Sequence, residues 1–84
     1  MRGWTPRDLR QAFAANLLRY AKGISHEGFA YEAGVNRTYV SKLEMGTSYP
    51  GLEIIAELAT VLEVEPAELI KLPVRQPPSS VGPE

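Results

Sequence analysis

The sequence predicts an all-α fold, and three observations support this prediction. Apolar residues recur at the three- and four-residue spacing of amphipathic helices. No stretch shows the strict alternation of a half-buried strand. Capping residues and glycines divide the chain into short segments. The expected helices span about 6–22, 26–33, 37–45, 52–62 and 66–71. Residues 1–72 are therefore expected to form one domain, and residues 73–84 a disordered tail.

The composition limits the classes of function that remain. The 84 residues include no cysteine and one histidine, so a disulfide framework or a thiolate metal site is excluded. No apolar run approaches the roughly 20 residues of a membrane span, and the N-terminus lacks a signal-peptide pattern, so we expect a cytoplasmic protein. Residues 1–46 carry seven basic and four acidic side chains, against two and six in residues 47–84. This asymmetry suggests one surface for phosphate, although such a split also occurs by chance.

The first helix is predicted by its start, its inner stripe and its end. Thr5 can cap it, Pro6 suits the first helical position, and Asp8 stands where a carboxylate can return to the cap amide. The inner stripe follows at helical spacing and contains Leu9, Phe13, Leu17 and Tyr20. Gly23 is expected to end the helix in the left-handed conformation. The pattern indicates a helix that packs into the core.

Residues 25–46 indicate two short helices separated by a sharp turn. Gly34 supplies the positive φ of the turn, and Asn36 caps the second helix. Val40 and Leu43 of that helix are expected to face inward. Its outward side chains are polar and comprise Arg37, Thr38, Ser41 and Lys42. Such a unit is typical of a helix-turn-helix, whose second helix lies in the major groove of DNA.

The fourth predicted helix is apolar on two sides. One stripe is expected to face the core and contains Leu52, Ile55, Ala59 and Leu62. The other stripe contains Ile54, Leu58 and Val61. A helix in so small a domain cannot easily bury both stripes within its own chain, so we expect the second stripe to form a homodimer interface. The alternative is that it packs beneath the C-terminal segment, where Pro66 opens a fifth helix.

The order of these blocks resembles the Cro/CI-type, or XRE-type, helix-turn-helix DNA-binding domains. The resemblance covers about residues 9–72 and rests on Leu17 and Arg19, the blocks ISHEGFAYEAGV and NRTYVSKLEMG, Pro50, and the stretch LEIIAELATVLEVEPAELI. The block AYEAGVNRTYVSKLE is also similar to the small homodimeric controller proteins of restriction–modification systems. The resemblance implies a compact five-helix Cro/CI-repressor-like domain in which the second and third helices form the helix-turn-helix.

The same resemblance implies roles for individual side chains. Base contacts are expected from Arg37, Thr38 and Lys42. Contacts with the DNA backbone are expected from His26, which stands where the family usually has a glutamine, and from Asn36, Tyr39 and Met45. Arg19 and Glu44 are expected to form a partly buried ion pair that joins the first helix to the recognition helix. The plainer alternatives are solvated charges at Arg37 and Lys42, a surface histidine at His26, packing on the domain at Tyr39, and an exposed acid at Glu44.

Two functional hypotheses follow from the sequence. The first is a homodimeric, sequence-specific transcriptional regulator that binds double-stranded DNA at a pseudo-palindromic operator, without cofactor, metal or small-molecule ligand. The second is a protein-interaction module, such as an antitoxin or adaptor, built on the same fold. An enzyme is not expected, because the chain lacks a nucleophile–base pair and is too small for a deep pocket.

Overall fold

The protein folds into five helices in a computed structural model that describes residues 3–72. They are α1 (Pro6–Tyr20), α2 (His26–Ala33), α3 (Arg37–Glu44), α4 (Leu52–Leu62) and α5 (Pro66–Ile70). The described residues contain no strand, so the predicted all-α, five-helix fold is confirmed. α1, α3 and α5 end one or two residues earlier than expected. None of the five helices is long and apolar enough to cross a membrane. The predicted tail, residues 73–84, lies outside the described residues.

Local capping explains where the first helices begin and end. Thr5 and Asp8 form a reciprocal capping box, in which each side chain accepts the other's backbone N–H at 3.0 Å. Ser25 Oγ accepts a hydrogen bond, also at 3.0 Å, from the backbone N–H of the third residue of α2. Gly34 ends α2 with a φ of 71°, in the left-handed region that glycine tolerates. Gly23 also has a positive φ, but it lies in the turn beyond the end of α1 and does not itself cap the helix.

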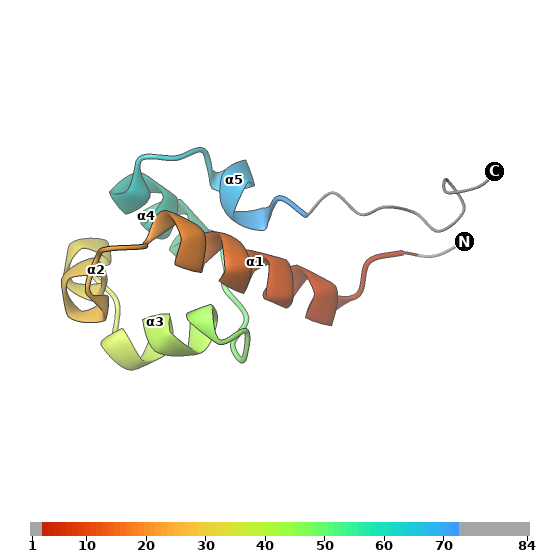
Figure 1. Ribbon diagram of the computed structural model, residues 1–84, viewed down its shortest axis with the longest axis horizontal. Coiled ribbons are helices and arrows are strands. Elements are labelled where there is room, and N and C mark those ends of the chain that lie inside the picture. Colours follow the sequence, from red (N-terminus) through yellow and green to blue (C-terminus); the bar gives the residue numbers. More distant parts are fainter. Residues whose placement is uncertain (1–2, 73–84) are drawn as a thin grey trace.

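One apolar core joins all five helices. Its fully buried side chains come from every helix and are Phe13, Leu17, Phe29, Val40, Leu43, Leu58 and Leu69. α1 runs through the middle of the molecule, with α3 on one side and α5 on the other (Figure 1). α2 packs against α3 and α4, and α4 also packs against α5. The core therefore holds α3 by its inner face at one edge of the domain.

The predicted dimer stripe on α4 is wrong, because both apolar sides of this helix are used inside the chain. Ile54 and Leu58 are 9% and 0% exposed, and Val61 is half-buried against the core. The physical reason is that α4 packs against α2 and α5, so each flank finds a neighbour within the same chain. Leu52 was expected on the inner stripe, yet it is exposed at the start of the helix.

Polar side chains fix α5 against α1. Asn16 is buried in α1, and its Nδ2 donates hydrogen bonds to the backbone oxygens of Leu69, at 3.0 Å, and Lys71, at 2.8 Å. Carbonyls at the end of a helix have no helical partner, so Asn16 satisfies groups that burial would otherwise leave unpaired. The Tyr20 hydroxyl donates to Glu68 at 2.8 Å, and this hydrogen bond raises the pKa of Tyr20. The end of the described chain is thus attached to α1 by hydrogen bonds as well as by apolar packing.

Candidate nucleic-acid interface

α3 has a buried face and an exposed face. Val40 and Leu43 are fully buried in the core. The three predicted base-reading residues, Arg37, Thr38 and Lys42, are all exposed. The structure therefore brings them together on the outer side of a single eight-residue helix. Their guanidinium, hydroxyl, methyl and ammonium groups are the kinds of group that contact base edges and thymine methyls in the major groove.

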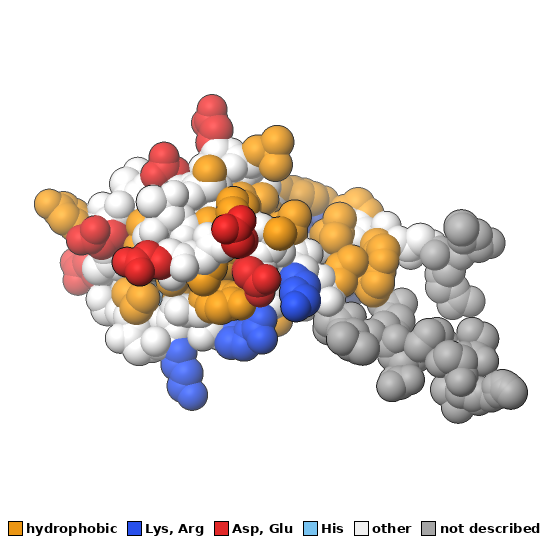
Figure 2. Space-filling view, turned by 90° about the horizontal axis from the view of Figure 1, so that it is seen from above, with side chains coloured by type: hydrophobic (Ala, Val, Ile, Leu, Met, Phe, Trp, Pro, Cys, Tyr) orange, Lys and Arg blue, Asp and Glu red, His pale blue; other side chains and the backbone are white. Residues whose placement is uncertain are grey.

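Acidic side chains gather on the part of the molecule that carries α4 and α5. Figure 2 looks onto this side and shows carboxylates spread over it, with the visible Lys and Arg side chains toward one edge. The exposed acids of α4 and the turn after it are Glu53, Glu57, Glu63 and Glu65. In Figure 1, α5 lies across α1 from α3. Glu53 and Glu57 of α4 line a surface hollow together with Gly34 and Val35, so part of this acidic surface lies close to the turn before α3.

Two of the predicted backbone-contacting residues flank the outer face of α3. Asn36 caps the helix, since its Oδ1 accepts hydrogen bonds from the backbone N–H groups of Thr38, at 2.6 Å, and Tyr39, at 3.3 Å. The cap uses the amide oxygen and leaves Nδ2 as a donor. Met45 lies at the other end and is exposed, but its backbone N–H is already bonded to carbonyls of α3. Asn36 can therefore donate to a phosphate, whereas Met45 offers an apolar side chain.

Tyr39 is tied to the protein rather than free to donate. Its ring is half-buried against the core, and its hydroxyl donates a hydrogen bond to the backbone oxygen of Tyr49 at 3.0 Å. A phenol has a single hydrogen to donate, and a phosphate oxygen can only accept. In this arrangement Tyr39 holds the loop after α3 in place, which agrees with the alternative of packing on the domain.

The loop after α3 is also held by α1, through residues that the sequence did not single out. The Arg10 guanidinium lies 4.3 Å from the centroid of the Tyr49 ring. Gly46 is buried with a φ of 74°, and a Cβ at this position would lie 3.2 Å from the Gln11 side chain. These contacts join residues far apart in the chain, so no local pattern could have indicated them.

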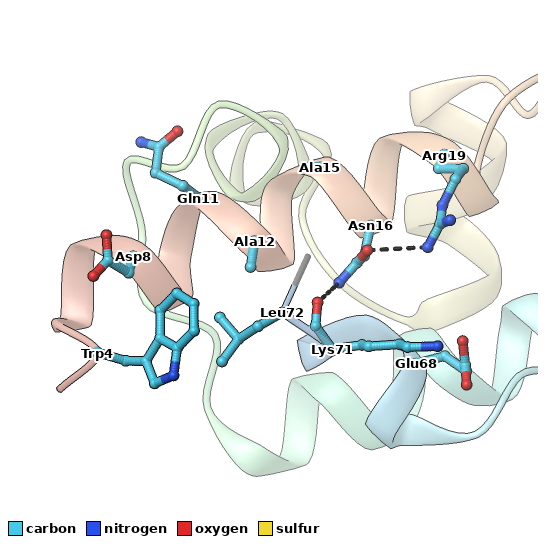
Figure 3. Close-up of a pocket in the computed structure, with 10 residues that line it drawn as sticks. All are labelled: Trp4, Asp8, Gln11, Ala12, Ala15, Asn16, Arg19, Glu68, Lys71 and Leu72. Atoms are coloured by element: carbon cyan, nitrogen blue, oxygen red, sulfur yellow. Dashed lines mark hydrogen bonds between the residues drawn. The ribbon is translucent and has the colours of Figure 1, made fainter. Parts of the chain in front are cut away.

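The predicted ion pair between Arg19 and Glu44 is wrong, because Arg19 lies on the side of α1 that faces α5. Its Nη2 donates to Asn16 Oδ1 at 3.1 Å, and its guanidinium lies 4.9 Å from the centroid of the Tyr20 ring. Figure 3 shows Arg19 beside Asn16, next to the end of α5. Glu44, the last residue of α3, instead pairs through Oε1 with Nε2 of His26, the first residue of α2.

Comparison with known proteins identifies the family. Residues 16–69 match the helix-turn-helix family HTH_3. This chain belongs to that XRE-type family of DNA-binding transcription regulators. The family consists of regulators and not of enzymes, as the sequence predicted.

Three similar proteins illustrate the range of the family. SlrR, an HTH-type transcriptional regulator of Bacillus subtilis, is 39% identical over 54 residues, which are 63% of this chain and 36% of SlrR. The hypothetical transcription factor NHTF from Neisseria has a TM-score of 0.74 and 32% identity, covering 87% of this chain and 86% of that chain. The restriction–modification controller protein C.AhdI from Aeromonas hydrophila has a TM-score of 0.65 and 42% identity, covering 71% of this chain and 94% of that chain. The resemblance to XRE-type domains and to controller proteins is thereby confirmed.

Proposed function

We propose that this protein is a sequence-specific transcriptional regulator that binds a pseudo-palindromic operator as a homodimer. The observation that supports this function best is the outer face of α3. This capped helix exposes Arg37, Thr38 and Lys42, while its opposite face is buried in the core. Similarity to a transcriptional regulator and to a controller protein points to the same function.

The chemistry of these three side chains suits base reading. Arg37 can bind guanine O6 and N7 with two parallel N–H donors, which contributes about 1–3 kcal/mol of discrimination against the wrong base. Thr38 offers a hydroxyl and a methyl group, and Lys42 offers an ammonium group for guanine or a phosphate. The exposed amide of Asn36 would contact the phosphate backbone at the start of the helix. Base contacts would then choose the sequence, and phosphate contacts would set the register.

A homodimer is proposed because one copy presents one recognition helix and so reads half a site. The second copy must use apolar surface that the fold leaves uncovered, since the Ile54, Leu58 and Val61 stripe is occupied. Leu52 fits this role, because it is 85% exposed at the start of α4. Leu52 lies outside α3, so a dimer contact at Leu52 would not use the proposed base-reading face of α3.

The experiment that tests this function is selection of bound duplexes from random-sequence DNA. We expect enrichment of two inverted half-sites whose centres lie about 10–10.5 base pairs apart, or a multiple of this spacing. Binding should weaken steeply as salt rises, because phosphate contacts release counterions. The absence of any enriched sequence would contradict the proposal.

A protein-interaction module remains the second candidate, and the acidic side of the molecule favours it. Exposed carboxylates of α4 and the following turn could receive a basic protein partner. In that case the protein would form a stoichiometric complex with such a partner and would show no salt-dependent binding to DNA.

A further inference from the structure

We propose that His26 is a positioning residue for the recognition helix, acting through its ion pair with Glu44. The inference rests on the proposed DNA-binding function, because the quantity that it predicts is the discrimination between base sequences. His26 would not touch the bases itself. It would set the angle between α2 and α3, and therefore the place of Arg37, Thr38 and Lys42 in the groove.

The positions of the two residues make the pair a closure of the helix-turn-helix. His26 is the first residue of α2, and Glu44 is the last residue of α3. The peptide chain joins the other ends of the two helices through residues 34–36. α2 and α3 are thus connected at the turn by covalent bonds and at their outer ends by the His26–Glu44 pair. α2 and α3 also pack against each other through the core, and the pair adds a point of attachment at their outer ends that limits the angle between them.

The burial of Glu44 indicates that the contact matters energetically. The Glu44 side chain is 6% exposed, whereas that of His26 is 48% exposed. Within residues 3–72, His26 is the group that forms an ion pair with Glu44, and no hydrogen bond to Glu44 comes from another side chain. A carboxylate is disfavoured at the C-terminal end of its own helix and favoured at the N-terminal end of another. Glu44 stays at the C-terminal end of α3, and its side chain also meets the N-terminal end of α2 through His26.

Loss of the imidazole would leave a buried carboxylate without its partner. Removal of the half-exposed imidazole takes away the partner of a carboxylate that is 6% exposed, and the carboxylate is then drawn toward water. An outward movement of the end of α3 would hydrate Glu44 more fully. Base-reading groups need positions accurate to about 0.5 Å, so such a shift would weaken base contacts before it unfolded the domain.

The pair also argues against His26 as a simple phosphate donor, which was the role expected from the sequence. If Nε2–H is directed at Glu44, the neutral imidazole has no second N–H, since its Nδ1 is then an acceptor. The ring could donate to a phosphate at the same time only as the imidazolium. Positioning and phosphate contact differ in their consequences, because a phosphate contact affects all sequences equally and also contributes to the salt dependence.

The test compares His26→Ala, His26→Gln and the neighbouring control Glu27→Gln, all in the full chain. The probes are the duplex that the wild-type protein selects from random DNA and the same duplex with one strongly selected base pair changed. For His26→Ala we expect the affinity ratio between the two duplexes to fall about tenfold, with an unchanged slope of log affinity against log salt. His26→Gln keeps an N–H donor for Glu44 and should retain the ratio within about threefold, and Glu27→Gln should match the wild type.

Each outcome is decisive, provided that far-UV circular dichroism shows the variants folded at the temperature of measurement. If His26→Ala fails to fold, His26→Gln combined with Glu44→Ala tests the same pair. A fall in the ratio relative to His26→Gln alone supports the inference, and an unchanged ratio overturns it. A folded His26→Ala that keeps the wild-type ratio overturns it. A uniform loss of affinity with a salt slope reduced by about one overturns it in favour of a phosphate contact. If the wild-type protein selects no duplex, the proposed function itself fails, which is a separate result.

Discussion

α3 and α4 differ in how much of their surface is buried in the core. α3 buries Val40 and Leu43 on one face and exposes charged side chains on the other. α4 packs against two other helices and buries Ile54, Ile55, Leu58 and Ala59 on two flanks. The difference shows that one helix supplies stability and the other supplies a surface. Changes in α4 should therefore affect the free energy of unfolding, and changes on the outside of α3 should affect DNA binding.

The largest effect is expected from Leu58→Ala in α4. Leu58 is fully buried, and its loss should reduce the free energy of unfolding by about 2–5 kcal/mol, since it removes buried methyl groups and leaves a cavity. Leu52→Ala is the matched control on the same helix, because Leu52 is exposed and should change stability by less than about 0.5 kcal/mol. Urea unfolding followed by circular dichroism measures both. If both variants lost the same free energy of unfolding, the contrast between the buried Leu58 and the exposed Leu52 would be wrong.

The next effect concerns self-association. Leu52→Asp should weaken the proposed dimer by about 2 kcal/mol or more if this side chain lies at the centre of the interface, because a charge replaces a buried apolar contact. Sedimentation equilibrium measures the change as a shift of mass toward the monomer. Tyr31→Asp is the control, since Tyr31 is 83% exposed on α2 and lies outside the proposed contact. An unchanged mass for Leu52→Asp would exclude Leu52 as a dimer contact.

Arg37→Ala is expected to lower DNA affinity by a comparable amount, and Lys42→Ala is expected to lower it by less. Loss of a bidentate guanine contact should cost about 1–3 kcal/mol of binding and relax the choice of base at one position. Stability should be unchanged, because Arg37 is exposed and makes no described ion pair within the protein. Fluorescence anisotropy with a selected duplex measures the affinity. Lys22→Ala, an exposed basic residue outside α3, is the control and should leave base preference intact.

A smaller effect is expected from Asn36→Ala. The change removes the acceptor for the N–H groups of Thr38 and Tyr39 at the start of α3, and should reduce stability by about 1 kcal/mol. Asn36→Ser retains an acceptor at the cap and should recover most of this loss. Thermal unfolding followed by circular dichroism at 222 nm, which reports helix content, compares the stabilities of the variants. If the serine variant were no more stable than the alanine variant, capping would not explain the role of Asn36.

The local features of the fold could be predicted because neighbouring residues carry them. Thr5, Ser25 and Asn36 act as caps within three residues of their partners, and Gly34 turns the chain by its own conformational freedom. The polar face of α3 follows from helical spacing alone. These signals predicted five helices, and they predicted that the proposed base-reading residues Arg37, Thr38 and Lys42 lie on one of them.

Long-range contacts could not be predicted in the same way. The sequence shows that Glu44 is flanked by apolar residues, but its partner depends on which side of α1 faces α3. Arg19 lies on the α5 side and is bonded to Asn16, whereas His26 reaches Glu44 from the start of α2. The loop contacts of Arg10 with Tyr49 and of Tyr39 with the Tyr49 carbonyl depend on the same packing.

By itself, then, the sequence determined the helices, the sharp turn and the polar outer face of residues 37–45, because caps, glycines and periodicity act over a few residues. Tertiary structure decided that both flanks of α4 are buried and that Glu44 pairs with His26. The physical reason is that burial and ion pairing depend on which surfaces meet when helices pack. A helical pattern in the sequence shows how many faces of a helix are apolar, but it does not show which residues cover them.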